Sequence, residues 1–112
     1  MVHEMKLNDN PFKKIKAGTK KIEMRLYDEK RKKINIGDII EFTSRETGEV
    51  IKAKVLNLHI VKSFEELYNM FDKVLLGYDK LEEACYTDME QYYSKDEIDA
   101  CGVVGIEIEL IK

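Results

Sequence analysis

The chain is organised around the stretch Gly18-Thr19-Lys20-Lys21-Ile22-Glu23-Met24-Arg25-Leu26. From Lys21 onward, charged and apolar residues alternate, and successive side chains of a β-strand point to opposite faces of the sheet. The stretch therefore predicts a strand. Its apolar face, which consists of Ile22, Met24 and Leu26, is expected to pack on the core.

The opposite face of this strand is polar. Glu23 and Arg25 lie two positions apart, which places their Cα atoms roughly 7 Å from each other. With Lys21 and Tyr27 beside them, they form a row that could hold a small polar ligand, and Gly18 ahead of the row permits a tight turn. The other interpretation is a solvated strand face with a surface ion pair, which contributes little to stability.

Length and composition indicate one domain over residues 1–112, because typical domains have roughly 100–150 residues. Hydrophobic residues make up 44% of the chain and charged residues 37%, which is typical of a globular domain rich in charge. No apolar run approaches the roughly 18–20 residues that cross a bilayer. The first residues also lack the apolar core of a signal peptide. We therefore expect a cytoplasmic protein with no membrane partner.

The residues that most often bind metals are few. The two cysteines, Cys85 and Cys101, and the two histidines, His3 and His59, are not in the spacing of a metal site. No metal and no cofactor are therefore expected. Reduced thiols are typical of a cytoplasmic chain, and a disulfide between the two cysteines is the alternative.

Charge is distributed unevenly along the chain. Residues 1–62 carry 15 Lys and Arg against 9 Asp and Glu, a net charge of +6, whereas residues 63–112 carry 4 against 13, a net charge of −9. Such asymmetry can indicate a surface that faces a polyanion. The overall net charge of −3 argues against tight non-specific DNA binding, which depends on many phosphate contacts. A nucleic-acid role would therefore be local.

Two short elements are expected before the central stretch. Residues 4–7 predict a strand with Met5 and Leu7 inward. The stretch Asn8-Asp9-Asn10-Pro11 is typical of a helix start, because Asn and Asp are favoured N-caps and Pro is accepted in the first turn. Gly18 lies where a C-cap glycine belongs, so this helix has about two turns and leads directly into the central strand.

A dense charge run, Asp28-Glu29-Lys30-Arg31-Lys32-Lys33, follows that strand. Its usual meaning is a solvated loop or turn. Because it follows the polar row directly, Arg31 and Lys33 could instead help to attract an anion.

Three more strands are predicted. Ile39, Ile40 and Phe42 begin the first, and a hairpin turn over residues 45–49 leads to a long strand over residues 50–61 with a β-bulge near Asn57. The alternation of Ile106, Ile108 and Leu110 with charged residues predicts a last strand over residues 103–111.

The segment between these strands is helical in pattern. Capping boxes, which place a Ser or Thr three residues before a Glu, predict helices that begin at Ser63, Thr87 and Ser94. A further short helix is expected over residues 79–85, after a buried connector closed by Gly77. The architecture is therefore α+β, a barrel-like sheet interrupted by a helical insertion at residues 63–101, before the last strand.

The pattern Gly18-x-Lys20-x-x-Glu23-x-Arg25, the pattern Gly37-Asp38-x-Ile40-x-Phe42 and the closing Gly102-Val103-Val104-Gly105-Ile106 resemble the ASCH domain family, in its small stand-alone bacterial type. The resemblance covers nearly the whole chain. It implies a PUA-like mixed β-barrel with short helices flanking a cleft, and an RNA, nucleotide or nucleoside ligand in that cleft.

The residues of the central strand have the chemistry for such a ligand. Lys20 and Arg25 could meet phosphate or carbonyl oxygens, since Arg suits planar bidentate recognition, and Glu23 could accept a hydrogen bond from an exocyclic amine. Stacking on a base would come from aromatic residues near the cleft. The candidates are Tyr27, Tyr92 and Tyr93. For the last two, the alternative is a helix face packed on the barrel, and we favour that alternative for one of them.

A hydrolase is the alternative function. One bacterial branch of the family is similar to an amidohydrolase that removes the acetyl group of N4-acetylcytidine with a lysine, a threonine and a glutamate. Lys20 matches that lysine, Glu23 replaces the threonine, and Glu82 or Glu83 could supply the glutamate. Strict strand alternation places Lys20 on the opposite face from Glu23 unless the turn before it reorients it. Glu23 could act as general base while Lys20 and Arg25 hold an oxyanion.

A third interpretation is a module that docks a protein partner through its acidic half, residues 63–101. The sequence names no such partner, and it leaves the oligomeric state open.

Overall fold

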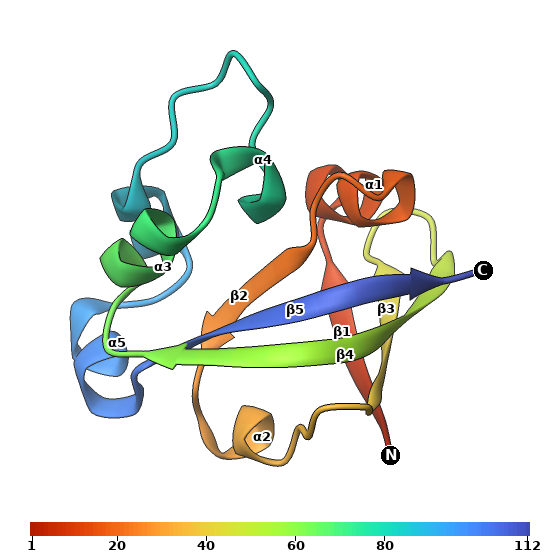
Figure 1. The fold of residues 1–112 in the computed structure, drawn as a ribbon, viewed down its shortest axis with the longest axis horizontal. Coiled ribbons are helices and arrows are strands. Elements are labelled where there is room, and N and C mark those ends of the chain that lie inside the picture. Colours follow the sequence, from red (N-terminus) through yellow and green to blue (C-terminus); the bar gives the residue numbers. More distant parts are fainter.

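Five strands form one sheet in the computed structural model, which describes residues 1–112 (Figure 1). The strands are β1 (Val2–Leu7), β2 (Ile22–Leu26), β3 (Ile39–Ser44), β4 (Val50–Val61) and β5 (Val103–Ile111). Their order in the sheet is β1-β3-β4-β5-β2. Only β1 and β3 pair in parallel, and the other three pairs are antiparallel. Every strand predicted from the sequence is present.

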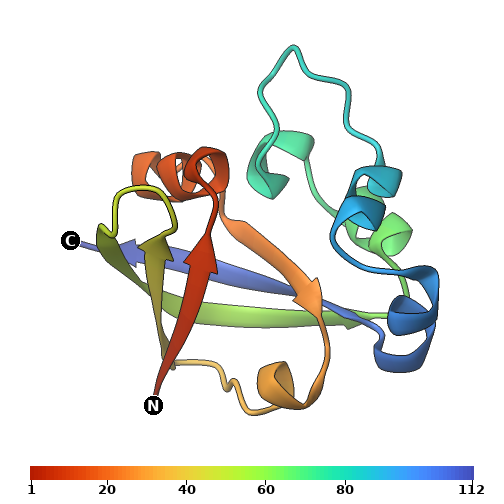
Figure 2. The ribbon, with the colours of Figure 1, turned by 180° about the vertical axis from the view of Figure 1, so that it is seen from behind.

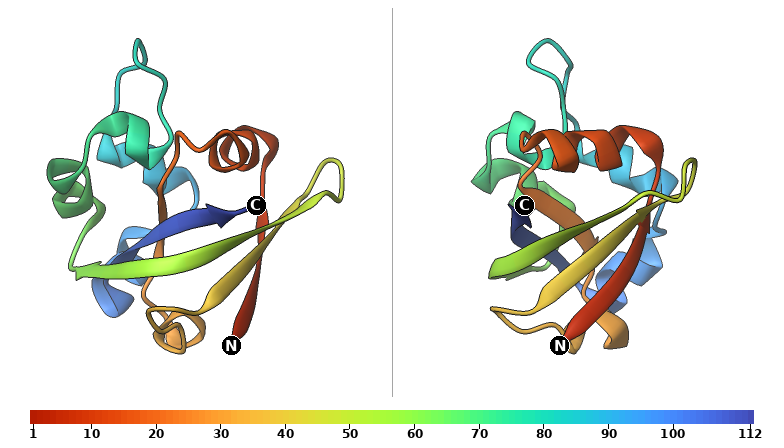
Figure 3. Two further views of the ribbon diagram at one scale, coloured as in Figure 1. Left: turned by 45° about the vertical axis from the view of Figure 1, so that its right-hand side comes forward. Right: turned by 90° about the vertical axis from the view of Figure 1, so that its right-hand side faces the viewer.

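The sheet curls into a half-barrel, which brings its two edge strands, β1 and β2, toward each other (Figure 3). One side chain bridges these edges: Arg25 on β2 donates from Nη2 to the carbonyl oxygen of Lys6 on β1, at 3.2 Å. The predicted α+β, PUA-like fold is confirmed.

The long strand β4 contains the predicted irregularity. Its register with β5 shifts between Val55 and Asn57, which is a β-bulge. The bulge bends the strand, so that β4 contributes both to the half-barrel and to the end of the molecule where the helices lie.

Helix α1 (Asp9–Ala17) carries the chain from β1 to β2. It buries Phe12 and Ile15, and it ends at Gly18, whose φ of 85° lies in the left-handed region that glycine favours. The N–H of Gly18 donates to the carbonyl of Ile15. The helix start at Asn8 and the stop at Gly18 are both as predicted.

The remaining helices are short. They are α2 (Glu29–Lys32), α3 (Phe64–Met70), α4 (Lys73–Leu76), the 3-10 helix η1 (Tyr86–Gln91) and α5 (Lys95–Cys101). All except α2 belong to the insertion, and they gather beside β2 and the nearby ends of β4 and β5 (Figure 2). Ser63 and Ser94 are the N-caps of α3 and α5 as predicted, and each serine oxygen accepts a backbone N–H. The capping box is complete at Ser94, whereas at Ser63 the Glu66 carboxylate accepts the N–H of Lys62 instead.

Two local predictions are wrong. Residues 79–85 form turns and coil, because Leu81 is 99% exposed and its side chain has no surface to pack on. Thr87 caps no helix, since η1 begins one residue earlier and the Thr87 hydroxyl contacts the sulfur of Cys85 at 2.9 Å. The charge run contains the single helical turn α2, which Asp28 caps by accepting the N–H of Arg31.

Two apolar clusters form the core, and β2 lies between them. The first fills the concave side of the half-barrel and contains Phe12, Ile40 and Phe42. The second lies under the insertion helices. The predicted inward face of β2 packs in this second cluster, with its residues Ile22, Met24 and Leu26. No helix is both long enough and apolar enough to span a bilayer.

Candidate ligand-binding cleft

A cleft of about 630 Å³ lies between the half-barrel and the insertion. One wall comes from the end of β1 and the start of α1, the base from the start of β2, and the other wall from the insertion. The polar residues that line it are Lys6, Asn8, Asn10, Lys20, Glu23, Arg25, Arg45, Tyr68, Tyr78, Glu82, Asp88, Gln91, Tyr92 and Tyr93.

The polar face of β2 turns toward the concave side of the sheet. Glu23 pairs with Ile106 and Arg25 with Val104 across the β2–β5 ladder. Directly paired residues share a face, and Ile106 and Val104 belong to the first core cluster. Glu23 is consequently only 4% exposed. The interpretation of this row as a solvated strand face is therefore wrong.

Lys20 joins this row from outside the strand. It precedes β2, in a segment without regular structure, where its backbone N–H donates to the carbonyl of Lys14. The turn at Gly18 therefore does reorient it, and its Nζ lies 3.3 Å from Oε1 of Glu23. Lys20 is 7% exposed, and its Nζ also donates to the carbonyl oxygen of Leu76 at 3.0 Å.

Arg25 completes the row on the other side of Glu23. Its Nε donates to Oε2 of Glu23 at 2.7 Å, and its Nη2 donates to the Lys6 carbonyl. Each carboxylate oxygen of Glu23 therefore faces a different cation. The Lys20–Glu23–Arg25 row, named here as the base triad, forms the floor of the cleft.

Within the base triad, Glu23 and the neighbouring cations stabilise each other's charged forms. Burial by itself would raise the pKa of the Glu23 carboxyl, but the adjacent Lys20 ammonium and Arg25 guanidinium outweigh burial and hold that pKa below its usual value of 4.5. For Arg25, burial would lower the pKa, and the Glu23 carboxylate instead raises it above its usual value. Glu23 is therefore an anion at neutral pH, placed between two cations.

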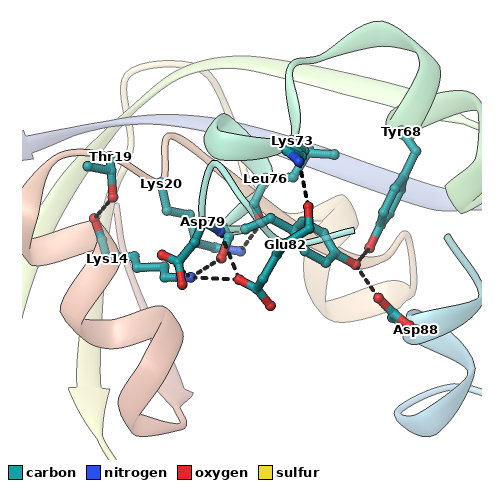
Figure 4. Close-up of polar contacts among 11 residues, drawn as sticks. Lys14, Thr19, Lys20, Tyr68, Lys73, Leu76, Asp79, Glu82 and Asp88 are labelled. Atoms are coloured by element: carbon teal, nitrogen blue, oxygen red, sulfur yellow. Dashed lines mark hydrogen bonds and ion pairs between the residues drawn. The ribbon is translucent and has the colours of Figure 1, made fainter. Parts of the chain in front are cut away.

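A second lysine anchors the insertion to α1, close to Lys20 (Figure 4). The Nζ of Lys14 donates to the carbonyl of Gly77 at 2.6 Å and pairs with Asp79 at 3.3 Å and Glu82 at 3.6 Å. Lys14 and Lys20 thus bind two consecutive carbonyls, those of Gly77 and Leu76, at the C-terminal end of α4. Cations are favoured there because the carbonyls of a last helical turn have no partners within the helix.

Hydroxyl groups form the far wall of the cleft. The hydroxyl of Tyr78 donates to Oδ2 of Asp88 at 2.7 Å, and the hydroxyl of Tyr68 lies 2.7 Å from that of Tyr78 (Figure 4). Burial, together with the neighbouring Tyr68 and Asp88, raises the pKa of Tyr78. Burial likewise raises the pKa of Tyr68. Both tyrosines are therefore neutral donors at neutral pH.

The two predicted stacking tyrosines differ in exposure. Tyr92 is 57% exposed at the cleft. Tyr93 also reaches the cleft, but its ring stacks on Phe64 with 5.8 Å between centroids and packs on the second core cluster. Burial raises the pKa of the Tyr93 hydroxyl. Tyr92 is the more exposed tyrosine, its ring tilted against that of Tyr93 with 6.4 Å between centroids, whereas Tyr93 is partly a core residue.

The structure does not bring Tyr27 and Arg31 into the cleft. Tyr27 packs against the first core cluster, with the ammonium of Lys32 5.8 Å from its ring centroid. Arg31 pairs with Asp28 at 3.1 Å, while its Nε is buried without a hydrogen-bond partner.

Several cleft residues were not identified from the sequence. Tyr68, Tyr78 and Asp88 belong to the insertion, and no spacing signal links them to β2. Lys6 and Arg45 lie at the rim, both exposed and without an ion pair. Arg45 lies there because its N–H donates to the carbonyl of Leu7, beside the end of β1. No group of three or more His, Cys, Asp or Glu side chains is placed to hold a metal ion.

The chain is similar to proteins of known structure over its whole length. The hypothetical protein PH0355 of Pyrococcus is 42% identical, with a TM-score of 0.82, and the match covers 99% of this chain and 100% of that one. Protein PF0455 of Pyrococcus furiosus is 34% identical, with a TM-score of 0.72, and the match covers 100% of this chain and 99% of that one. No curated protein matches this chain.

The model of one protein family, the ASCH domain, matches residues 5–112. The match includes the last part of β1, the other four strands, the base triad and the insertion, and it agrees with the two structural relatives. The chain therefore belongs to the ASCH domain family.

Proposed function

We propose that this protein binds RNA or a nucleotide in the cleft, with the base triad as the centre of the site. The observation that carries the proposal is the convergence of Lys20, Glu23 and Arg25 on the floor of one concave, largely buried space. Charged groups that are this buried are costly unless they are paired, and a cleft with a few convergent polar groups is typical of a ligand site. Membership of the ASCH family is consistent with a PUA-like RNA-binding module.

The rim of the cleft suits the phosphates of such a ligand. Lys6 and Arg45 are exposed and carry no counter-charge, and they lie on the wall opposite the acidic insertion. Phosphate contacts position a nucleic acid without reading its sequence. Tyr92, with its exposed ring, is the candidate for stacking on a base, which is worth about 1–3 kcal/mol per base.

Binding of fluorescein-labelled RNA from a random short-oligonucleotide pool, followed by anisotropy, tests the proposal. The variant Lys6→Ala/Arg45→Ala should weaken binding at least tenfold or so at low salt, since charge-assisted contacts are lost. The variant Lys54→Ala/Lys62→Ala removes the same charge from exposed positions outside the cleft and should bind as the unmodified protein does. Equal losses in both variants, or no binding at all, would contradict the proposal.

One observation supports the hydrolase alternative. Glu23, as an anion beside two cations at the base of a cleft, has the arrangement of a general base next to an oxyanion site. The ammonium of Lys20, in contrast, is held by Glu23 and the Leu76 carbonyl, which does not suit a nucleophile. Release of cytidine from N4-acetylcytidine, with Lys20→Ala as control, decides this. Turnover equal to that control counts against catalysis.

The cytoplasmic location belongs to this proposal. Both cysteines are free, Cys85 exposed and Cys101 half-buried, as suits a reducing compartment. A protein partner for the acidic insertion stays a prediction.

A further inference from the structure

The hydrogen-bonding groups of the base triad have an order that selects among ligands. Along the floor of the cleft the order is the Lys20 ammonium, the Glu23 carboxylate and the Arg25 guanidinium, with contacts of 3.3 Å and 2.7 Å between neighbours. An ammonium and a guanidinium can only donate hydrogen bonds, and an ionised carboxylate can only accept them. The floor therefore presents one acceptor between two donors.

Each member of the row keeps hydrogen-bonding capacity for a ligand. Lys20 has three N–H donors, of which one goes to the Leu76 carbonyl and one faces Glu23. Arg25 has five, of which one goes to Glu23 and one to the Lys6 carbonyl. Each oxygen of Glu23 has a second lone pair in addition to the one that its cation occupies.

Among the bases of RNA, uracil presents the complementary order. Its N3–H donor lies between two carbonyl acceptors, O2 and O4. Cytosine places an acceptor nitrogen at that position, guanine pairs one carbonyl with two donors, and adenine has no carbonyl. Single-stranded RNA is commonly recognised on this Watson–Crick edge.

The geometry points to a uracil-type base as the ligand group that the base triad selects, with N3–H donating to Glu23 and the two carbonyls accepting from Lys20 and Arg25. This inference rests on the proposed function and makes it more specific. Cytosine is rejected because its N3 lone pair would face the Glu23 carboxylate, which leaves two buried acceptors without a donor between them.

The surroundings of the base triad fit a planar base. Tyr92 lines the cleft on the insertion side with an exposed ring. Lys6 and Arg45 lie at the rim, where the ribose phosphate of such a base would leave the cleft. The alternative is a base triad that only ties β1, β2 and α4 together, and this alternative predicts no discrimination between bases.

Anisotropy with labelled RNA homopolymers of equal length separates these cases in the unmodified protein. The strands are oligo(U), oligo(C) and an oligo(U) in which every base is 3-methyluridine, which lacks the N3–H donor. We expect oligo(U) to bind at least roughly tenfold more tightly than either of the others, in line with the discrimination of a good bidentate contact.

The outcomes distinguish this inference from the proposed function. Equal binding of all three strands overturns the selection of uracil and leaves the binding of RNA intact. No binding of any strand overturns both. Competition by uridine monophosphate, but not by cytidine monophosphate, supports the inference and identifies a single nucleotide as sufficient. If oligo(U) competes and neither mononucleotide does, the result supports the inference and identifies an RNA strand as the ligand.

A variant provides an independent check. Glu23→Gln places an amide at the centre of the row, and an amide can donate to the N3 of cytosine. The preference for oligo(U) over oligo(C) should therefore narrow or reverse. Affinity for oligo(C) should persist, since Lys6 and Arg45 are unchanged. An unchanged preference in a folded Glu23→Gln protein would overturn the inference, and if the variant does not fold, the 3-methyluridine comparison decides.

Discussion

Lys20 and Glu23 form a buried ion pair, with 3.3 Å between Nζ and Oε1, although Lys20 lies outside the strand that carries Glu23. The pair exists because the chain turns at Gly18 and because the Leu76 carbonyl holds the ammonium from the insertion side. It joins α4 to the end of α1 and to β2, which are close to each other in the sequence and far from α4.

Removing the Glu23 carboxylate should destabilise the folded protein. Glu23→Ala leaves the Lys20 and Arg25 cations buried without their shared anion, which we expect to lower the free energy of unfolding by about 3–5 kcal/mol. Glu29→Ala removes an exposed partner of Lys32, 3.4 Å away, and should cost less than about 1 kcal/mol. Urea denaturation measures both. Similar losses in the two variants would show that the buried pair has no special role.

The same carboxylate should contribute to acid unfolding. Because the pKa of Glu23 is lower in the folded protein than its usual 4.5, its stabilisation is fully present above that value and is lost as the pH falls through the lowered pKa. Glu23→Gln should therefore flatten the decline of stability below pH 4.5. Denaturant titrations over the acid range check this, and an identical decline in the variant would contradict it.

A second acid-sensitive contact lies at the start of the chain. The His3 side chain bonds Asp38 at 2.8 Å, and this hydrogen bond, with that from the Asn35 N–H, lowers the pKa of Asp38 from 3.8 to about 2. Its stabilisation should be present above pH 3.8 and lost between there and pH 2 or so. A carboxyl titration by NMR tests this directly. In His3→Ala the Asp38 midpoint should rise, and an unchanged midpoint would contradict the assignment.

Gly77 should be sensitive to any side chain. Its φ is 111°, and a Cβ there would meet Cδ of Lys20 at 3.1 Å and Nζ at 3.3 Å. Gly77→Ala should therefore cost more than the backbone strain of about 1–2 kcal/mol, and it should weaken ligand binding by moving Lys20. The matched control is Gly48→Ala, where φ is 77° and a Cβ meets nothing within 4 Å. Equal effects of the two variants on binding would contradict a role for Lys20.

The anchor at Lys14 should control the mobility of the segment that follows α4. Lys14→Met removes its contacts to Gly77, Asp79 and Glu82. We expect the local stability of this segment to fall by about 1.5 kcal/mol, which is typical of a lost hydrogen bond to a charged group. Its backbone amides should then exchange roughly tenfold faster. Lys13→Met, on the exposed side of the same helix, should leave that exchange unchanged. Hydrogen exchange measured by NMR distinguishes the two.

Local signals in the sequence predicted most of the fold. Gly18 ended its helix, Ser94 opened another, and the break in alternation near Asn57 marked a bulge, because each feature depends on residues only a few positions apart. The helix predicted over residues 79–85 does not form, for the complementary reason. The pattern around Leu81 suggested an apolar face, but no neighbouring surface covers it.

The sequence by itself determined the family, the strands and the identity of the three charged residues on and before β2. Only the tertiary structure decided that these charges meet, that Lys20 joins them from outside the strand, and that Tyr92 and Tyr93, but not Tyr27, line the same cleft. The physical reason is that burial and pairing depend on elements distant in the chain. The carbonyls of Lys6 and Leu76 are 70 positions apart in the sequence. They hold the Arg25 and Lys20 cations on either side of the Glu23 carboxylate.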